Sequence, residues 1–207
     1  MIDVHIDVAA SVAAMPLQGC VLHGVPAMKG LEDLKRHEWV IRETVPDLVI
    51  QTGTAVGGSA MWLAHSWFFY DGPDVITIDV DADLVDERLH ASDKITVLNG
   101  SSTDEEIVST VKNIAWDYDR VQVILDSDHS SKHVSREIEL YAPLVSSGCY
   151  LVIEDGIYDF AGEGPFNPGP LTAIVDHMPG NPLWTRDLDL ERLFPVSMYP
   201  AGWWKRK

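Results

Sequence analysis

Residues 47–59 read Asp47-Leu-Val-Ile-Gln-Thr-Gly-Thr-Ala-Val-Gly-Gly-Ser59, a stretch in which an apolar strand gives way to a helix. Residues 48–50 are too few for a helix and are typical of a buried parallel strand. The strand breaks at Thr52-Gly53, and helical composition follows from Gly57. Glycine lets a ligand approach the backbone, and the first N–H groups of a helix favour polar or negative atoms. The stretch therefore predicts a cradle for a small molecule.

A second apolar strand, predicted at residues 75–80, carries an acid at Asp79, about 25 residues beyond the first strand. An acid near the end of the second strand suits the two hydroxyls of a ribose. The spacing therefore predicts a nucleoside cofactor. By itself it does not choose between NAD and S-adenosylmethionine.

Apolar strands and helical segments alternate along the chain, which is the pattern of a parallel sheet covered by helices on both faces. Strands are predicted at residues 48–51, 75–80, 95–98, 121–125, 150–153, 184–186 and 196–199. Helices are predicted at residues 31–45, 58–69, 83–90, 104–115, 132–142 and 171–178, with Ser102 or Thr103 capping the fourth. We expect an α/β, doubly wound, Rossmann-like domain at residues 31–207. Residues 1–30 are expected to be an irregular extension that contacts substrate or a second subunit.

The composition predicts one globular domain without affinity for nucleic acid. The 207 residues are 46% hydrophobic and carry a formal net charge of −17. Nucleic-acid binding needs basic side chains to neutralise phosphates, and the basic run here is confined to residues 205–207. We expect a cytoplasmic protein without a membrane span, because the longest apolar run, residues 8–17, is too short and no basic leader precedes it. Cys149 is expected to be a buried apolar residue rather than a disulfide partner of Cys20.

Acidic side chains follow two of the predicted strands. Asp126 ends the fourth strand, and Glu154 and Asp155 end the fifth. Carboxylates brought onto one rim repel one another unless a cation lies among them, and oxygen ligands favour Mg²⁺. The alternative is that these acids cap helices and face solvent. Beside a metal site, His129 is a candidate general base, since its unperturbed pKa of about 6.5 suits proton removal near neutrality. His133 is expected on the surface.

Six segments together resemble the cephalosporin-hydroxylase-like, or rhamnosyl O-methyltransferase-like, family of class I S-adenosylmethionine-dependent methyltransferases. The similarity runs from about residue 22 to the C-terminus. The segments are Gly24-Val-Pro-Ala-Met-Lys29, Pro46–Ser59, Gly100-Ser-Ser-Thr-Asp104, Leu125-Asp-Ser-Asp-His-Ser130, Ile153-Glu-Asp-Gly156 and Gly202-Trp-Trp-Lys-Arg206. The resemblance implies a seven-stranded, mostly parallel sheet whose last strand is antiparallel.

The resemblance also implies S-adenosylmethionine as the cofactor and assigns residues to it. The methionine end would lie at residues 52–58, the ribose at Asp79 and the adenine near Ser101 and Ser102. The full set of expected cofactor-binding residues is Gln51, Thr52, Gly53, Thr54, Gly57, Gly58, Ser59, Asp79, Ser101, Ser102, Asp126 and Ser127. Related metal-dependent enzymes hold Mg²⁺ at positions that match Asp126, Glu154 and Asp155. His129 stands where some of these relatives have a catalytic lysine, and Gln51 stands where the family usually has glutamate.

These observations predict a Mg²⁺-dependent O-methyltransferase acting on a small hydroxylated molecule such as a sugar, a natural product or a catechol. Asp126 and His129 are the expected catalytic residues, and we expect a homo-oligomer that binds neither nucleic acid nor membrane. Residues 156–170 are a candidate lid, because the loop is long and rich in glycine, proline and phenylalanine. Its aromatic side chains, Tyr158, Phe160 and Phe166, are suited either to stacking on the acceptor or to packing the lid.

Two other functions remain open at this point. An NAD-dependent oxidoreductase would use the same kind of cradle, although the spacing of Gly53, Gly57 and Gly58 departs from G-x-G-x-x-G. A catalytically silent cofactor-binding subunit is the second alternative, and Gln51 is the feature that favours it.

Overall fold

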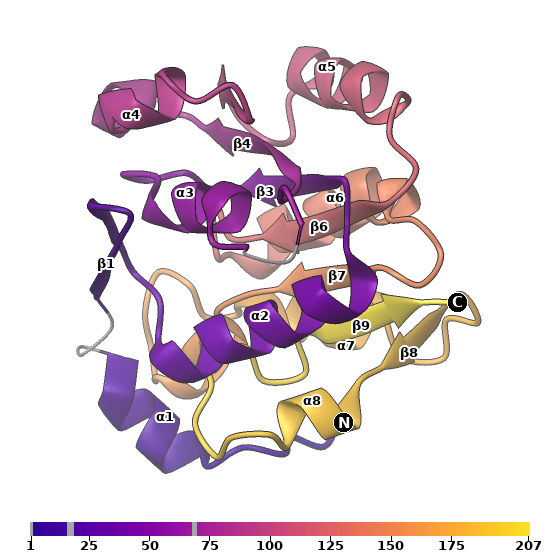
Figure 1. Cartoon of the computed structure of the whole chain (residues 1–207). Coiled ribbons are helices and arrows are strands. Elements are labelled where there is room, and N and C mark those ends of the chain that lie inside the picture. The colour runs from indigo at the N-terminus through magenta and orange to yellow at the C-terminus, as the bar shows by residue number, and fades with distance from the viewer. Residues whose placement is uncertain (1, 16–18, 68–69) are drawn as a thin grey trace.

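A seven-stranded sheet runs through the computed structural model, which describes residues 2–15, 19–67 and 70–207 (Figure 1). Its order is β5-β4-β3-β6-β7-β9-β8, and β9 is antiparallel to both of its neighbours. The strands are β3 (Leu48–Thr52), β4 (Asp74–Asp79), β5 (Ile95–Asn99), β6 (Val121–Leu125), β7 (Tyr150–Ile153), β8 (Trp184–Arg186) and β9 (Trp203–Arg206). The predicted doubly wound α/β sheet with an antiparallel last strand is confirmed.

Helices cover both faces of the sheet because its strands are apolar on both sides. Alternate residues of one strand enter different cores: Leu48 and Ile50 belong to one hydrophobic cluster, and Val49 to the other. In Figure 1, α2 lies in front of the sheet and α6 behind it. The face that Leu48 and Ile50 enter carries α5 (Glu105–Ala115), α6 (Ser131–Tyr141) and α7 (Pro170–His177). The face that Val49 enters carries α2 (Leu31–Thr44), α3 (Gly58–His65) and α4 (Glu87–His90). A further short helix, α8 (Leu188–Glu191), precedes β9.

The order of the strands reverses at β3, which pairs in parallel with β4 on one side and with β6 on the other. In open α/β sheets, ligands bind outside the carboxyl ends of the strands at such a reversal. The glycine-rich turn after β3 and the acid after β6 both lie at this point. The topology therefore places the predicted cradle and the predicted acidic residues at the same edge of the sheet.

The N-terminal residues are not irregular, and that prediction is wrong. They form α1 (Val8–Ala14) and a hairpin of β1 (Cys20–Leu22) and β2 (Val25–Ala27). The hairpin turn, His23-Gly24, has φ values of 49° and 81°, as a two-residue type I′ turn requires. Strands of three residues are too short to show a period, so the sequence pattern did not reveal them. Residues 16–18 lie outside the described ranges.

Three further predictions need correction. Residues 196–199 form no strand, and the position between β7 and β8 is filled by β9, which begins at Trp203. Helix α3 ends at His65, and the predicted end at residue 69 lies outside the described residues. Neither Ser102 nor Thr103 caps α5, whose N-cap is Asp104. Cys149 is fully buried and free, as expected. Within the described ranges, every helix is too short or too polar to cross a bilayer.

Arg36 of α2 fixes the segment that replaces the predicted strand. Its side chain is fully buried, and its guanidinium donates to the Asp33 carboxylate at 2.8 Å. The other donors reach backbone carbonyls of Leu190, Glu191, Phe194 and Val196 at 2.7–3.2 Å. Asp33 in turn accepts from Ser197 Oγ and from the backbone N–H of Met198. The segment before β9 is thus held by side chains of α2 and is unavailable for pairing with a strand.

We predict that Arg36→Met lowers the free energy of unfolding by about 3–5 kcal/mol, because it leaves a buried carboxylate and several carbonyls without donors. Urea unfolding followed by circular dichroism measures this loss. Lys35→Met is the control: Lys35 is exposed and pairs with Glu38 on the surface, so its change is expected within about 0.5 kcal/mol. Equal effects of the two substitutions would show that Arg36 does not anchor the segment.

Candidate active site

A cavity of about 900 Å³ opens at the carboxyl ends of the central strands. Ligand sites usually measure about 300–1,000 Å³, so the cavity has room for a nucleoside cofactor and a second small molecule. Its wall includes the turn after β3, the ends of β4 and β6, and the β1–β2 hairpin. The predicted cofactor residues that line it are Gly53, Thr54, Gly57, Gly58, Ser59, Asp79, Ser101, Ser102, Asp126 and Ser127.

The cradle after β3 is shaped by close backbone packing and by Asp79. Gly53 has a φ of 81°, and a Cβ placed there would lie 1.8 Å from the backbone carbonyl oxygen of Asp126. Asp79 Oδ2 accepts the N–H groups of Thr54 and Ala55 at 2.9 and 2.8 Å. Ala55 has a φ of 47°, which is strained for a residue with a side chain. The predicted ribose acceptor therefore also holds the cradle in its conformation.

Gln51 and Thr52 lie beneath the cradle, and both are buried. Gln51 Nε2 donates to the carbonyl of Gly53 at 2.6 Å and to Ser59 Oγ at 2.9 Å. Its Oε1 has no partner among the described residues. Neither Gln51 nor Thr52 is among the residues that line the cavity, so the structure places these two predicted cofactor residues below the site, where Gln51 supports the turn.

A polar network lies behind the predicted adenine end. Ser102 Oγ and Ser127 Oγ both donate to Glu137 Oε1, at 2.6 and 2.7 Å. His133 Nε2 lies 3.0 Å from Ser102 Oγ. His133 is therefore a lining residue of the cavity and not the surface residue that was expected. The sequence reasoning also missed Glu137, although the four-residue spacing from His133 on α6 places both on one helix face.

Asp126, His129 and Asp155 form the candidate metal cluster. Each offers one ligand atom, and these atoms lie within 4.8 Å of one another. His129 Nε2 is 3.4 Å from Asp155 Oδ2, and Asp155 sits in the left-handed region with a φ of 58°. The two carboxylate oxygens fit a hard divalent cation such as Mg²⁺ or Mn²⁺, whereas an imidazole nitrogen favours softer transition metals, so His129 is the weaker candidate ligand.

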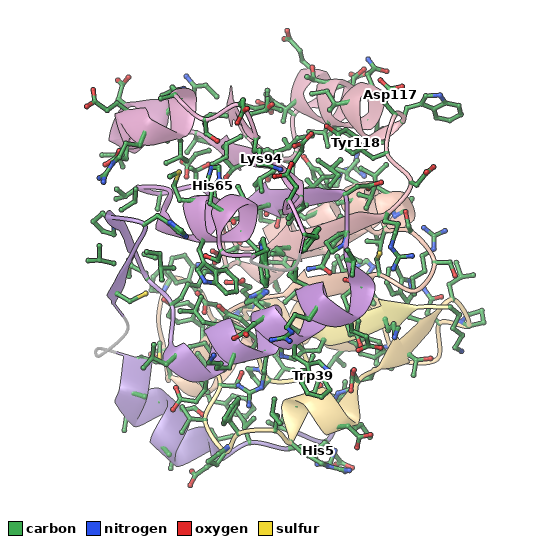
Figure 2. All side chains as sticks on the ribbon, in the orientation of Figure 1. His5, Trp39, His65, Lys94, Asp117 and Tyr118 are labelled. Atoms are coloured by element: carbon green, nitrogen blue, oxygen red, sulfur yellow. The ribbon has the colours of Figure 1, made fainter. Side chains whose placement is uncertain are left out.

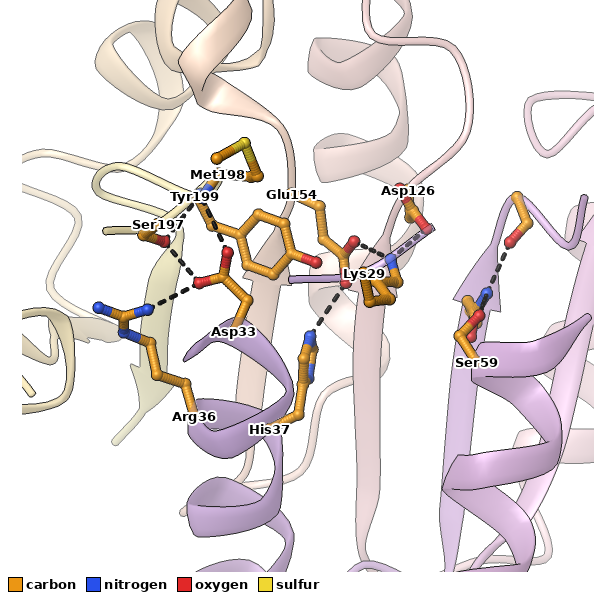
Figure 3. A network of polar contacts seen from close by, with 12 residues as sticks. Lys29, Asp33, Arg36, His37, Ser59, Asp126, Glu154, Ser197, Met198 and Tyr199 are labelled. Carbon is orange, nitrogen blue, oxygen red and sulfur yellow. Dashed lines mark hydrogen bonds and ion pairs between the residues drawn. The ribbon is translucent and has the colours of Figure 1, made fainter. Parts of the chain in front are cut away.

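Glu154 points towards Lys29 and His37, as Figure 3 shows. Its Oε1 accepts a hydrogen bond from His37 Nε2 at 3.0 Å, and its Oε2 accepts from Lys29 Nζ. Lys29 also donates to Asp126 Oδ2 at 2.5 Å. The structure thus places Asp126 and Asp155 together, with His129 beside them, and turns Glu154 towards a lysine. Sequence reasoning missed the contacts of Lys29 and His37, although Lys29 ends one of the six motifs.

The charges of the cluster shift its pKa values in opposite directions. Burial opposes the ionisation of Glu154, yet Lys29 and the hydrogen bond from His37 hold its pKa at about 2. Burial and the neighbouring charge of Glu154 raise the pKa of Asp155 to about 7. Burial, with the positive charge of Lys29, lowers the pKa of His129 to about 4. His129 is therefore neutral at pH 7, the form that accepts a proton or ligates a cation.

Two aromatic side chains of the candidate lid close around His129. The rings of Tyr158 and Phe166 each lie 5.3 Å from the imidazole ring, centroid to centroid, and 5.1 Å from one another. Phe160 is 40% exposed. The lid therefore supplies an aromatic wall beside the candidate base through Tyr158 and Phe166.

Comparison with known proteins adds to this geometry. A family model described as Rhamnosyl O-methyltransferase/CmcI matches residues 18–207. A rhamnosyl O-methyltransferase of Mycobacterium tuberculosis (strain H37Rv) is 33% identical over 185 residues, covering 86% of this chain and 75% of that protein. The rhamnosyl O-methyltransferase of Mycobacterium leprae is 30% identical over 190 residues, covering 89% of this chain and 82% of that protein.

Solved structures show the same fold. A CmcI structure described with Mg and SAM has a TM-score of 0.64 and 18% identity, and the match covers 91% of this chain and 76% of that one. An O-methyltransferase from Bacillus cereus in complex with SAH has a TM-score of 0.59 and 18% identity, with 86% and 79% covered. At this level of identity the likeness extends to the fold alone, which is the methyltransferase fold expected from the sequence.

The cradle geometry predicts that Gly53→Ala is more destabilising than Gly180→Ala. Both glycines have positive φ, 81° and 78°, but Gly180 has no atom within 4 Å of the added Cβ. The shared backbone strain costs roughly 1–2 kcal/mol. The clash with Asp126 adds about 1–3 kcal/mol for Gly53 alone. Urea midpoints measure the difference, and equal midpoints would contradict the close packing of β3 against the residue after β6.

Proposed function

The chain belongs to the rhamnosyl O-methyltransferase/CmcI family, and we propose that it transfers a methyl group from S-adenosylmethionine to a hydroxyl of a sugar-like small molecule, with a divalent cation bound. The observation that carries this proposal is that one cavity contains both the cradle held by Asp79 and the cluster of Asp126, His129 and Asp155. A cofactor in the cradle and an acceptor hydroxyl at the cluster would share that cavity.

The cradle would bind and orient the cofactor, whose sulfonium group supplies the methyl. Asp79 offers carboxylate oxygens to ribose hydroxyls, and Gln51 would support the turn beneath the cofactor through its hydrogen bonds to Gly53 and Ser59. Orientation is the main contribution expected of the protein, because methyl transfer needs an in-line approach rather than a covalent enzyme group.

Asp126 and Asp155 would hold the cation. The sequence predicts Glu154 as the third ligand, and water or substrate oxygens would complete the coordination shell, so that His129 stays free as the general base. A bound Mg²⁺ supplies positive charge that lowers the pKa of a nearby hydroxyl. As the general base, His129 would receive the acceptor proton at Nε2, where the Asp155 carboxylate at 3.4 Å would stabilise the imidazolium. Its pKa of about 4 makes it a weak base, so it needs an acceptor hydroxyl that is already acidified.

The acceptor class follows from the relatives. The mycobacterial proteins are named rhamnosyl O-methyltransferases, so a rhamnose-containing glycoside is the first acceptor to test, followed by macrolides and catechols. Tyr158 and Phe166 would form the wall against which the acceptor ring lies.

We expect Asp79→Ala to weaken the binding of S-adenosylhomocysteine by about 1.5–3 kcal/mol, a loss of roughly 10–150-fold in affinity. Isothermal titration calorimetry measures it, with the exposed Asp83→Ala variant as the control. Titration with NAD in parallel addresses the alternative enzyme class. Tight NAD binding with no heat from S-adenosylhomocysteine would contradict the proposed function.

Methyl transfer should stop in EDTA and return with Mg²⁺ or Mn²⁺, since both cations accept oxygen-rich sites.

His129→Ala should lower the rate by about 10²–10⁴-fold while leaving cofactor affinity unchanged. A radiolabelled methyl-transfer assay over the acceptor panel measures both effects. The exposed His90→Ala variant should keep the full rate. Full activity of His129→Ala at neutral pH, or full activity in EDTA, would refute the catalytic assignment, and no transfer to any acceptor would favour the silent subunit.

A further inference from the structure

Lys29 is a buried lysine at the acidic end of the cavity. It lies in the segment between β2 and α2, and its side chain is 7% exposed. Its Nζ contacts Asp126 Oδ2 and Glu154 Oε2, from residues 97 and 125 positions away in the sequence. The Tyr199 ring lies 5.7 Å from the same ammonium group. Lysine is almost never buried without a charged partner, and Lys29 has two.

The acidic side chains around Lys29 outnumber the basic ones. Asp126, Glu154 and Asp155 bring three negative charges when all are ionised. In the part of the chain that the structure describes, Lys29 is the one lysine or arginine that forms a salt bridge with any of them. With all three carboxylates ionised, as they would be around a bound cation, the net charge is −2, which a divalent cation would neutralise.

We propose that Lys29 is a positioning residue that serves as the resident counter-ion of the metal site: it holds Asp126 and Glu154 in place without a divalent cation, and its charge weakens the binding of that cation. The inference rests on the metal site of the proposed function. It follows from where the ammonium group lies, on oxygens of two of the three ligands that the sequence predicts. A cation entering the cluster is repelled by the ammonium group of Lys29. Repulsion between like charges falls with distance and with solvent screening. Lys29 contacts Asp126 directly and is buried, so both reductions are small.

The fold fixes Lys29 in this position. The β1–β2 hairpin that precedes it packs against α3 so closely that a Cβ on Gly58 would lie 2.3 Å from the carbonyl oxygen of Pro26. On its other side, Gly30 is the N-cap of α2, which carries His37 to the second oxygen of Glu154. Glu154 is thus held from two directions and does not line the cavity, so a cation is directed towards the carboxylates of Asp126 and Asp155.

The test is Mn²⁺ binding by the full-length chain without cofactor or acceptor, measured by calorimetry after EDTA treatment and dialysis. Lys29→Met should bind Mn²⁺ at least 10-fold more tightly than the wild type. It should also melt at a lower temperature in EDTA and recover with Mn²⁺, because the cation then replaces the missing charge. Lys29→Arg should stay near the wild type in both measurements. Lys35→Met makes the same change of net charge at an exposed position of α2 and should leave both unchanged.

A Lys29→Met variant whose Mn²⁺ affinity equals or falls below that of the wild type would overturn the inference, since a merely structural lysine has no reason to weaken cation binding. If Lys29→Met does not fold in EDTA, the Lys29→Met/Glu154→Gln double variant removes one charge of each sign and is expected to fold. It should bind Mn²⁺ more tightly than the Glu154→Gln single variant, from which it differs only at Lys29. Binding by the wild type with no change in either variant would refute the role of Lys29 alone. Absence of binding in every variant would refute the metal site as well, whereas cofactor titration tests the rest of the proposed function.

Discussion

Repulsion among carboxylates is the constraint on which this structure depends. Strands β6 and β7 end side by side, and an acid follows each strand. Asp126, Glu154 and Asp155 therefore meet at one place, where Glu154 is buried and the other two line the cavity. Such a cluster is stable only with compensating charge and hydrogen bonds. Lys29 and His37 supply part of that compensation. Both come from the N-terminal part of the chain, which explains why the hairpin and α2 are integral to the domain.

The acidic cluster and the cofactor cradle are rigidly joined through one residue. The backbone carbonyl of Asp126 packs against Gly53 with no room for a side chain, while its carboxylate reaches Lys29. A shift of the end of β6 therefore moves both halves of the cavity together. Precise mutual placement of two reactants is what methyl transfer asks of a protein, and here it comes from backbone contact between neighbouring strands rather than from a flexible loop.

Local sequence patterns predicted the elements whose cause is local. Short apolar runs marked the strands, and acids after those runs marked the rim of the cavity, because parallel strands bring their carboxyl ends to one edge. Contacts between residues far apart in the chain could not be predicted from these patterns. Residues 196–199 look like a strand, but Arg36 and Asp33 hold their backbone in another path. Lys29 reaches acids more than ninety residues away, and no periodicity around it reports that pairing. The resemblance included Lys29 in a motif without indicating what it touches.

Contacts between the two ends of the chain have a consequence for biosynthesis. The backbone N–H of Asp7 donates to the carbonyl of Pro195, and that of Ser197 donates to Ser11 Oγ, 186 residues away. Ribosomes add about 5–20 residues per second, so roughly 9–37 seconds separate the synthesis of these partners. During that interval the N-terminal helix lacks its docking surface, and Met198 is missing from the cavity wall. The cavity is therefore completed only after Met198 has been synthesised, which leaves the nascent chain unable to close around a ligand before that point.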